Sequence, residues 1–216
     1  MGAYKKLLFK GILLLGFLFI SQHHYSQFYH GIEIGMHRNN ADFMIGETAE
    51  PSPVTGFFIG YVAERDLSDN IFIRLGINFN RRELDAVARR GINTSDEKWG
   101  VDVIEIPVNL GYYINWNRRN FQFFVDAGVN LGFNNRAITE NEQETIRLDI
   151  GSDADLKRFG FGANAGIGVL IKKRVKLRAS YYTNLSSIVN TEGDNWKNKT
   201  IGLSINYFLK ERQLHY

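Results

Sequence analysis

The chain has 216 residues, with 26 Lys and Arg against 23 Asp and Glu, and it contains no cysteine. The lack of cysteine excludes disulfides and thiolate metal sites. The excess of positive charge equals the lysines at the start of the chain, Lys5, Lys6 and Lys10, so the remainder is balanced and does not indicate nucleic-acid binding.

Residues 1–27 have the pattern of a secretion signal. Lys5 and Lys6 form a positive n-region, 7–20 is an apolar stretch, and the small Ser26 suits the position before a cleavage site. The stretch is short and poorly flanked for a spanning helix, and no later run approaches the roughly 18 apolar residues that such a helix needs. The sequence therefore predicts a signal peptide over 1–27, one domain over 28–209 and a short tail over 210–216.

Eight segments of the predicted domain alternate between apolar and polar residues with a period of two. This period places apolar side chains on one face of a β-strand and polar side chains on the other. In the last segment, Ile201, Leu203 and Ile205 alternate with Gly202 and Ser204. The expected strands are 28–38, 54–64, 71–83, 101–114, 121–135, 158–171, 175–187 and 199–209.

The expected connections alternate between short and long. Short turns at one rim and long loops at the other are typical of an up-and-down barrel in the bacterial outer membrane, and strands of about ten residues can cross it at a tilt. The sequence therefore predicts an all-β fold, an eight-stranded antiparallel up-and-down transmembrane β-barrel preceded by a signal peptide. The short turns are expected at 65–70, 115–120 and 172–174, and the long loops at 39–53, 84–100, 136–157 and 188–198.

The polar face of these strands is expected to line the inside of the barrel. Alternation alone also fits a soluble barrel of the lipocalin kind, whose apolar face surrounds a ligand. However, the strand glycines fall on the polar face, and the inside of an eight-stranded barrel is barely wide enough for side chains. A cation that faced lipid near the midplane would cost about 2–4 kcal/mol, whereas inward acids and bases can pair. The inward charges form a predicted lumen cluster of Glu33, Arg74, Glu105, Asp126, Lys176 and Arg178.

Two functions are open to this lumen cluster. It could line a path for protons or small ions, or it could be a salt-bridged plug. Because open aqueous channels come with about sixteen strands, the plug is the favoured interpretation. Within the fourth strand, Pro107 cannot donate to the ladder, which predicts a bulge or local break near a rim.

The expected loops carry charges of opposite sign. They could pair with each other, bind divalent cations that bridge lipopolysaccharide, recognise a partner, or simply be solvated. Arginines in 81–90 are Arg81, Arg82, Arg89 and Arg90, and acids in 136–157 are Glu140, Glu142, Glu144, Asp149, Asp153 and Asp155.

Motifs of glycine and aromatic residues follow one another along the predicted strands. They are 56–61 (GFFIGY), 67–70 (LSDN), 104–107 (IEIP) with 108–113 (VNLGYY), 159–168 (FGFGANAGIG), 181–185 (YYTNL) and 202–208 (GLSINYF). Their order resembles the PorT-like outer-membrane β-barrel family of Bacteroidota, over nearly all of the chain after the predicted signal. Asn184, where the pattern often has a small residue, and the tail 210–216 depart from it.

The resemblance implies an eight-stranded barrel in the cell outer membrane with no known catalytic set. One founding member of the family is tied to protein secretion and gliding, so a secretion or envelope protein is an expected partner. The resemblance also implies assembly by the general outer-membrane insertion machinery, which reads a terminal strand that ends in aromatic residues. Tyr207 and Phe208 are the expected assembly signal.

The predicted function is that of an integral outer-membrane protein with a structural or interaction role. The sequence contains no nucleophile motif or phosphate loop, and His30, His37 and His215 lack metal-ligand spacing, so we expect no enzyme activity, cofactor or metal. Expected lipid partners are outer-membrane lipid and lipopolysaccharide. A narrow pore for small solutes and a soluble lipocalin-like carrier are the alternatives.

Overall fold

The computed structural model describes residues 28–45, 48–90, 93–114, 120–141 and 144–211, and the predicted signal peptide lies outside them. Within these residues no helix is long and apolar enough to cross a membrane. The strands are β1 (Phe28–Met44), β2 (Thr48–Asp66), β3 (Ile71–Arg90), β4 (Asn93–Ile114), β5 (Phe121–Glu140), β6 (Thr145–Leu148), β7 (Phe159–Ile171), β8 (Val175–Asn184) and β9 (Asn195–Phe208).

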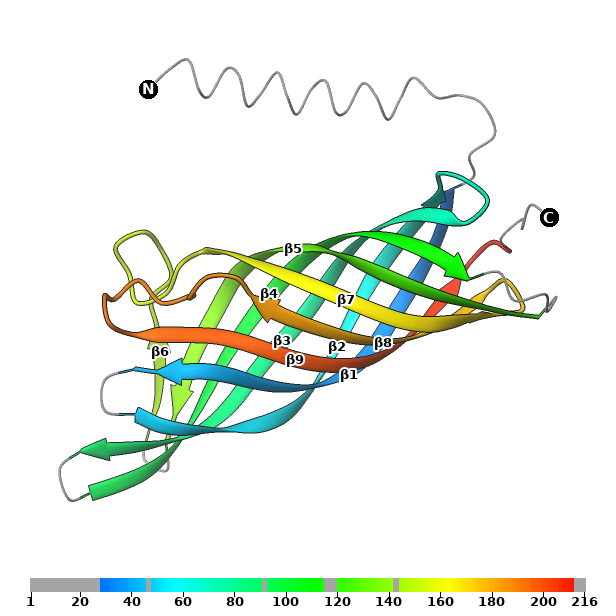
Figure 1. Cartoon of the computed structure of the whole chain (residues 1–216). Coiled ribbons are helices and arrows are strands. Elements are labelled where there is room, and N and C mark those ends of the chain that lie inside the picture. The colour runs from blue at the N-terminus through cyan, green and yellow to red at the C-terminus, as the bar shows by residue number, and fades with distance from the viewer. Residues whose placement is uncertain (1–27, 46–47, 91–92, 115–119, 142–143, 212–216) are drawn as a thin grey trace, which may run out of the picture.

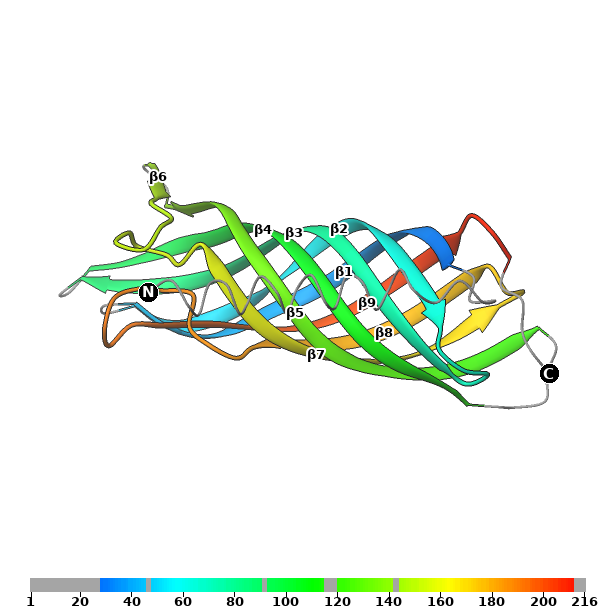
Figure 2. The same cartoon turned by 90° about the horizontal axis from the view of Figure 1, so that it is seen from above.

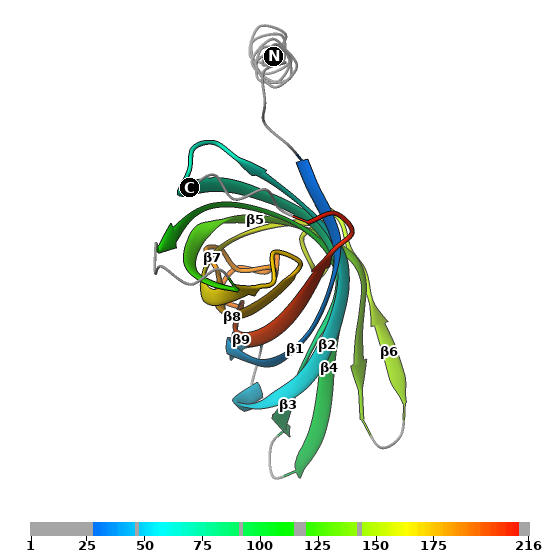
Figure 3. The same cartoon turned by 90° about the vertical axis from the view of Figure 1, so that its right-hand side faces the viewer.

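Eight of these strands close into a ring. Their order is β1–β2–β3–β4–β5–β7–β8–β9, and β9 pairs back onto β1, with Ile34 opposite Ile205. All neighbouring pairs are antiparallel, and the tilted strands enclose an elongated barrel (Figures 1 and 2). The short β6 pairs with β5 outside the ring and projects from the barrel wall (Figure 3). The predicted eight-stranded antiparallel barrel is confirmed, with β6 as an addition that the sequence analysis missed.

Both ends of the described chain lie at the same end of the barrel, which we call the terminal end. There, Gly31 near the start of β1 pairs with Phe208 at the end of β9. The turns 67–70 and 172–174 lie at the terminal end as well (Figure 1). The opposite end, which we call the distal end, carries the long β3–β4 hairpin and the segments 149–158 and 185–194.

Two of the predicted long loops, 39–53 and 84–100, are mostly strand. β1 continues to Met44, β3 to Arg90, and β4 begins at Asn93. Likewise, 136–140 belongs to β5 and 145–148 forms β6. The prediction was wrong because the alternation continues beyond the expected strands with the opposite polarity: Leu84 and Ala86 are buried on the inner face of β3.

The apolar face of the sheet points outward, as predicted from the glycines and charges. Ile201 is 66% exposed and Ile34 53%, whereas Glu33 and Asn206 are buried inside the ring. The lipocalin-like arrangement is therefore wrong. Glycine relieves crowding inside: a Cβ on Gly166 would lie 2.5 Å from Nε of Arg178, whose side chain reaches across β7.

Apolar side chains close the lumen at both ends, which the sequence analysis missed. Between the two clusters lies a layer of charged and amide side chains, which we call the polar layer. The terminal cluster consists of Tyr29, Val62, Phe72, Tyr113, Phe124, Leu170 and Phe208. The distal cluster consists of Ala41, Phe43, Leu84, Ala86, Trp99, Val101, Val103, Ala137, Leu156, Ile188, Val189 and Trp196.

Tyr113 belongs to the terminal cluster, although it lies near the end of a strand next to an outward tyrosine. Its side chain is only 2% exposed and lies inside the barrel. Its neighbour Tyr112 is the outward residue, at 48% exposed, as are Tyr181 and Tyr207. Neighbouring residues of a strand point to opposite faces, so a position near the strand end does not by itself tell which of the two tyrosines faces outward.

The outer face changes from apolar to polar at one level around the barrel. In β3 it changes from Phe79 to Arg81, and in the paired β4 from Ile104 to Asp102. β1 and β9 change in the same way, from Met36 to Arg38 and from Ile201 to Lys199. The apolar part of the outer face, between this level and the terminal end, is called the belt. It spans about ten residues per strand, which suits an apolar band of about 25 Å on strands tilted by about 45°.

Above this level the strands form a head of two packed layers. One layer is the distal part of β2–β3–β4–β5–β6, where β5 pairs with β4 and β6 rather than with β7. The other is the distal part of β1 and β9. Phe43 lies between Trp99 and Trp196 in edge-to-face contacts, with ring centroids 5.3 Å and 5.4 Å apart. The head thus has an apolar inside and a polar outside, the reverse of the belt.

Pro107 lies in the middle of β4, not near a rim as predicted. The β3–β4 ladder lacks pairs between Leu75–Val108 and Asn78–Glu105, but its register is unchanged. The interruption suits a residue without an N–H, and Gly76 accommodates the ring, since a Cβ there would lie 3.0 Å from Cγ of Pro107. The register shift of the neighbouring β4–β5 ladder falls elsewhere, between Asp102 and Val103.

Candidate functional site

The inward charges of β1, β2, β3 and β8 form one connected chain in the polar layer. Arg74 on β3 forms an ion pair with Glu33 on β1, and its Nε lies 3.6 Å from Oε1 of Glu64 on β2. Glu64 Oε1 in turn lies 2.7 Å from Nζ of Lys176 on β8. Ser204 donates to Glu33 at 2.8 Å. Because period two places all of these side chains inside a narrow ring, acids and bases from four strands come together.

Lys176 joins the polar layer to the terminal cluster. Its side chain is fully buried, and Nζ lies 3.9 Å from the ring centroid of Phe72 and 4.0 Å from that of Phe124. The Tyr113 ring is 5.3 Å away. Aromatic faces attract a desolvated ammonium, so three rings and Glu64 compensate the burial of this one charge.

A second group of inward residues surrounds Asp126 on β5. Arg178 from β8 donates to its carboxylate through Nη2 at 2.6 Å and through Nε at 2.9 Å. Asn109 on β4 donates to the same carboxylate at 2.7 Å, and Asn164 on β7 accepts from Arg178 at 2.9 Å. Asn164 also donates to Asn130. Four strands are therefore joined around one ion pair.

Glu105, the remaining member of the predicted lumen cluster, pairs with Arg82, which the sequence analysis had grouped with the charges of the loops. Nη2 of Arg82 lies 2.6 Å from Oε1 of Glu105, and its guanidinium is 3.8 Å from the ring centroid of Tyr182. Asn80 donates to the other carboxylate oxygen at 3.1 Å. The sequence signal for Arg82 is the period of two, which places it on the same inner face of β3 as Arg74 and Asn78.

The charges of the polar layer balance. Four acids, Glu33, Glu64, Glu105 and Asp126, face four cations, Arg74, Arg82, Lys176 and Arg178, and all eight side chains are buried. The cavity among them has a volume of about 60 Å³ and is lined by polar groups that include His37 and Asn78. Such a space holds only a few water molecules.

The predicted assembly residues point to opposite sides of the barrel wall. Tyr207 lies on the outer face and is 48% exposed, whereas Phe208 is fully buried in the terminal cluster. The backbone N–H of Phe208 donates to the carbonyl of Arg174 at 2.8 Å, which holds the end of β9 against the β7–β8 turn. Their recognition by the insertion machinery stays a prediction.

The charged segments that were expected to be loops do not act as one surface. Arg81 faces outward, where Nε lies 2.7 Å from Oε1 of Glu83, whereas Arg82 faces the lumen. In the segment 149–158, Asp155 accepts from the backbone N–H of Asp149 at 2.9 Å. Among the described residues, no group of three or more His, Cys, Asp or Glu side chains is placed to hold a metal.

A sequence model of the outer membrane protein beta-barrel domain matches residues 20–190 of the chain. The chain belongs to this family. Membership places the protein in the outer membrane, so its outward apolar belt faces lipid hydrocarbon. No curated protein matches the chain.

Several solved structures resemble this one over most of the chain. The chain is 15% identical to Neisserial surface protein A, NspA, with a TM-score of 0.47 and coverage of 85% of this chain and 99% of that one. It is 13% identical to Ail, the attachment invasion locus protein of Yersinia pestis, solved with a heparin analogue, with a TM-score of 0.46 and coverage of 85% and 99%. The outer membrane enzyme PagL is 9% identical, with a TM-score of 0.43 and coverage of 81% and 98%.

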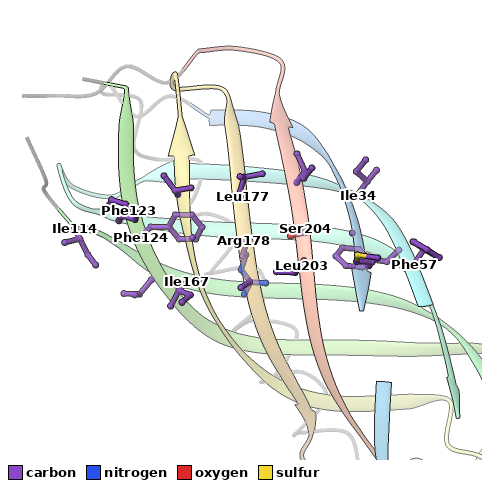
Figure 4. A pocket seen from close by; sticks show the side chains of 18 residues that line it. Ile34, Phe57, Ile114, Phe123, Phe124, Ile167, Leu177, Arg178, Leu203 and Ser204 are labelled. Carbon is purple, nitrogen blue, oxygen red and sulfur yellow. The ribbon is translucent and has the colours of Figure 1, made fainter. Parts of the chain in front are cut away.

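In an outer-membrane barrel the hollow on the outer face is a lipid contact. This depression of about 1050 Å³ lies over β4, β5, β7, β8, β9, β1 and β2, and side chains such as Ile167, Leu203 and Phe57 line it (Figure 4). Its lining is almost entirely apolar, as expected of a surface that contacts acyl chains. Arg178 lies behind this wall, with its head group turned to Asp126 inside.

Removal of one cation from the connected charge chain tests how tightly the polar layer holds the barrel. We expect Arg74→Gln to lower the free energy of unfolding by about 3–5 kcal/mol, because Glu33 and Glu64 lose a buried partner. Urea unfolding in lipid vesicles, followed by tryptophan fluorescence, measures the change.

The matched control is Lys199→Gln on the outer face of the head. Lys199 donates to Asp42 at 2.8 Å, which raises the pKa of its amine, but both side chains are solvated. Its unfolding midpoint should stay close to that of the unchanged protein. If both variants lose the same free energy of unfolding, the buried ion pairs stabilise the barrel no more than the solvated pair does.

Proposed function

We propose that the protein is a closed, non-enzymatic anchor of the outer membrane with a structural or interaction role. The observation that carries the proposal is the lumen, in which a balanced polar layer lies between two apolar clusters. A barrel filled in this way fixes a shape in the membrane and moves no solute. We infer that the terminal end faces the periplasm and the head lies at the cell surface.

The charge pairing supports a plug rather than a narrow pore. A path for ions needs a continuous wet volume, but the polar layer contains a cavity of about 60 Å³ and the ends are packed with aromatic and aliphatic side chains. Each lumen carboxylate also has a cation or an amide donor beside it, so none is left to bind a passing ion.

The same pairing supports a role without catalysis. A general base must reach a substrate proton, whereas the carboxylates of Glu33, Glu64 and Asp126 are buried in ion pairs inside the barrel. PagL shows that outer-membrane barrels of this kind can be enzymes. For this protein, the head supplies exposed charged residues that suit recognition of a partner instead.

A protein of a secretion or envelope assembly is the partner that we propose. The support is the resemblance of the strand motifs to the PorT-like family, together with an outward polar face on β3 and β4 that includes Asp85, Asp96 and Lys98. Beyond the membrane this face is rigid, because the distal cluster packs behind it.

Conductance decides between the plug and the pore. In planar bilayers, the purified folded protein should give no steady single-channel steps, because the polar layer and both clusters block the axis. A porin of sixteen strands, measured in the same bilayers, supplies the positive control. Regular, large steps that scale with protein concentration would contradict the proposed closed anchor.

Capture from native membranes tests the partner. We expect crosslinking followed by detergent extraction to recover an envelope or secretion protein, and the double variant Asp85→Lys with Asp96→Lys to lose it. Asp69→Lys, at the terminal end, is the matched control and should retain the partner. If all three proteins recover the same set of proteins, the polar face of the head is not the recognition surface.

A further inference from the structure

A second hollow on the outer face lies at the level where the belt changes from apolar to polar. It has a volume of about 350 Å³ and lies over β2, β3, β4 and β5. Its apolar wall consists of Phe57, Phe79 and Ile104, and its polar wall of Arg81, Asp102 and Asn135. We call it the interfacial pocket.

Two irregularities of the sheet open this pocket. The β2–β3 ladder shifts register between Pro53 and Phe58, so that β2 lacks its pairs beside Arg81. On the other side, Asp102 pairs with Arg136 and Val103 with Asn134, which leaves Asn135 as the extra residue of a β-bulge. Both irregularities occur at the same level, and bulges commonly re-aim side chains at barrel rims.

The two walls of the pocket are set by register. Phe79 pairs directly with Ile104, and two residues further along, Arg81 pairs directly with Asp102. The apolar pair is the last of the lipid-facing belt, and the charged pair is the first of the head. Phe57 also lines the apolar depression of Figure 4, so the pocket is continuous with the surface that contacts lipid chains.

Arg81 supplies the polar wall of the pocket with hydrogen-bond donors for an anion. Arg81 contacts Glu83 and Asp102 through Nε, at 2.7 Å and 3.7 Å, and its side chain is 47% exposed. A guanidinium has five donor hydrogens, so its terminal nitrogens can still donate to a phosphate. Arg136 is opposite Asp102, and Lys98 lies 3.1 Å from Glu83, so each acid beside Arg81 has a second cation nearby.

We propose that the interfacial pocket binds a membrane lipid whose phosphate headgroup carries a net negative charge. Arg81 donates to the phosphate, and the hydrocarbon chain lies along Phe57 and Phe79 into the apolar depression. This site does not depend on the lumen, so the proposal stands whether or not the barrel conducts.

Titration with defined lipids, followed by native mass spectrometry of the folded full chain, tests this site. The probes are dioleoyl-phosphatidylglycerol, which has a net negative phosphate headgroup, and dioleoyl-phosphatidylcholine, whose headgroup is zwitterionic. We expect one phosphatidylglycerol to bind several-fold more tightly than phosphatidylcholine. Arg81→Gln should weaken phosphatidylglycerol binding by about three- to tenfold and leave phosphatidylcholine binding unchanged.

The matched control is Lys197→Gln, which removes an outward cation of the head on β9, away from the pocket. This variant should bind phosphatidylglycerol like the unchanged protein. The proposal is overturned if the unchanged protein binds the two lipids equally, or if Lys197→Gln weakens phosphatidylglycerol binding as much as Arg81→Gln does.

Discussion

The narrowness of an eight-stranded ring is the constraint on which the rest of this structure depends. Side chains from opposite walls meet inside it, so every inward charge must find a partner within a few ångströms. Glu64 satisfies this condition between Arg74 and Lys176, and Asp126 satisfies it beside Arg178. The same crowding explains why Gly166 must lack a side chain where Arg178 crosses β7. Closure of the lumen is thus a consequence of barrel size and charge pairing together.

The second determinant is that the apolar residues change from the outer face in the belt to the inner face in the head. In the belt, lipid outside selects Ile, Leu and Phe on the outer face, and the lumen holds the charges. In the head, water outside selects Arg81 and Asp102, and Trp99 and Trp196 pack inside. A single continuous sheet therefore carries a membrane segment and a small packed head without a linker. The interfacial pocket lies at the boundary because both kinds of surface meet there.

Sequence reasoning found the ring, its antiparallel order and the direction of its faces, because the period of two holds through every belt strand. It also placed Glu33, Arg74, Glu105, Asp126, Lys176 and Arg178 on the inner face. It did not find the head, because charged residues such as Asp85 and Asp96 are typical of loops, although Leu84 and Ala86 kept the period of two. Which acid pairs with which base depends on register and strand tilt across the ring, and no local pattern encodes the Arg82–Glu105 pair.

The accessibility of spin labels tests most directly that the outer face is apolar in the belt and polar in the head. The sequence contains no cysteine, so single-cysteine variants are simple to prepare. Labels at Phe79→Cys and Leu203→Cys, in the protein reconstituted in lipid, should collide with dissolved oxygen and not with a water-soluble nickel chelate. Labels at Arg81→Cys and Asp42→Cys should show the reverse. Access of the nickel chelate to Phe79→Cys and Leu203→Cys would contradict the account, because it would place the apolar faces in water.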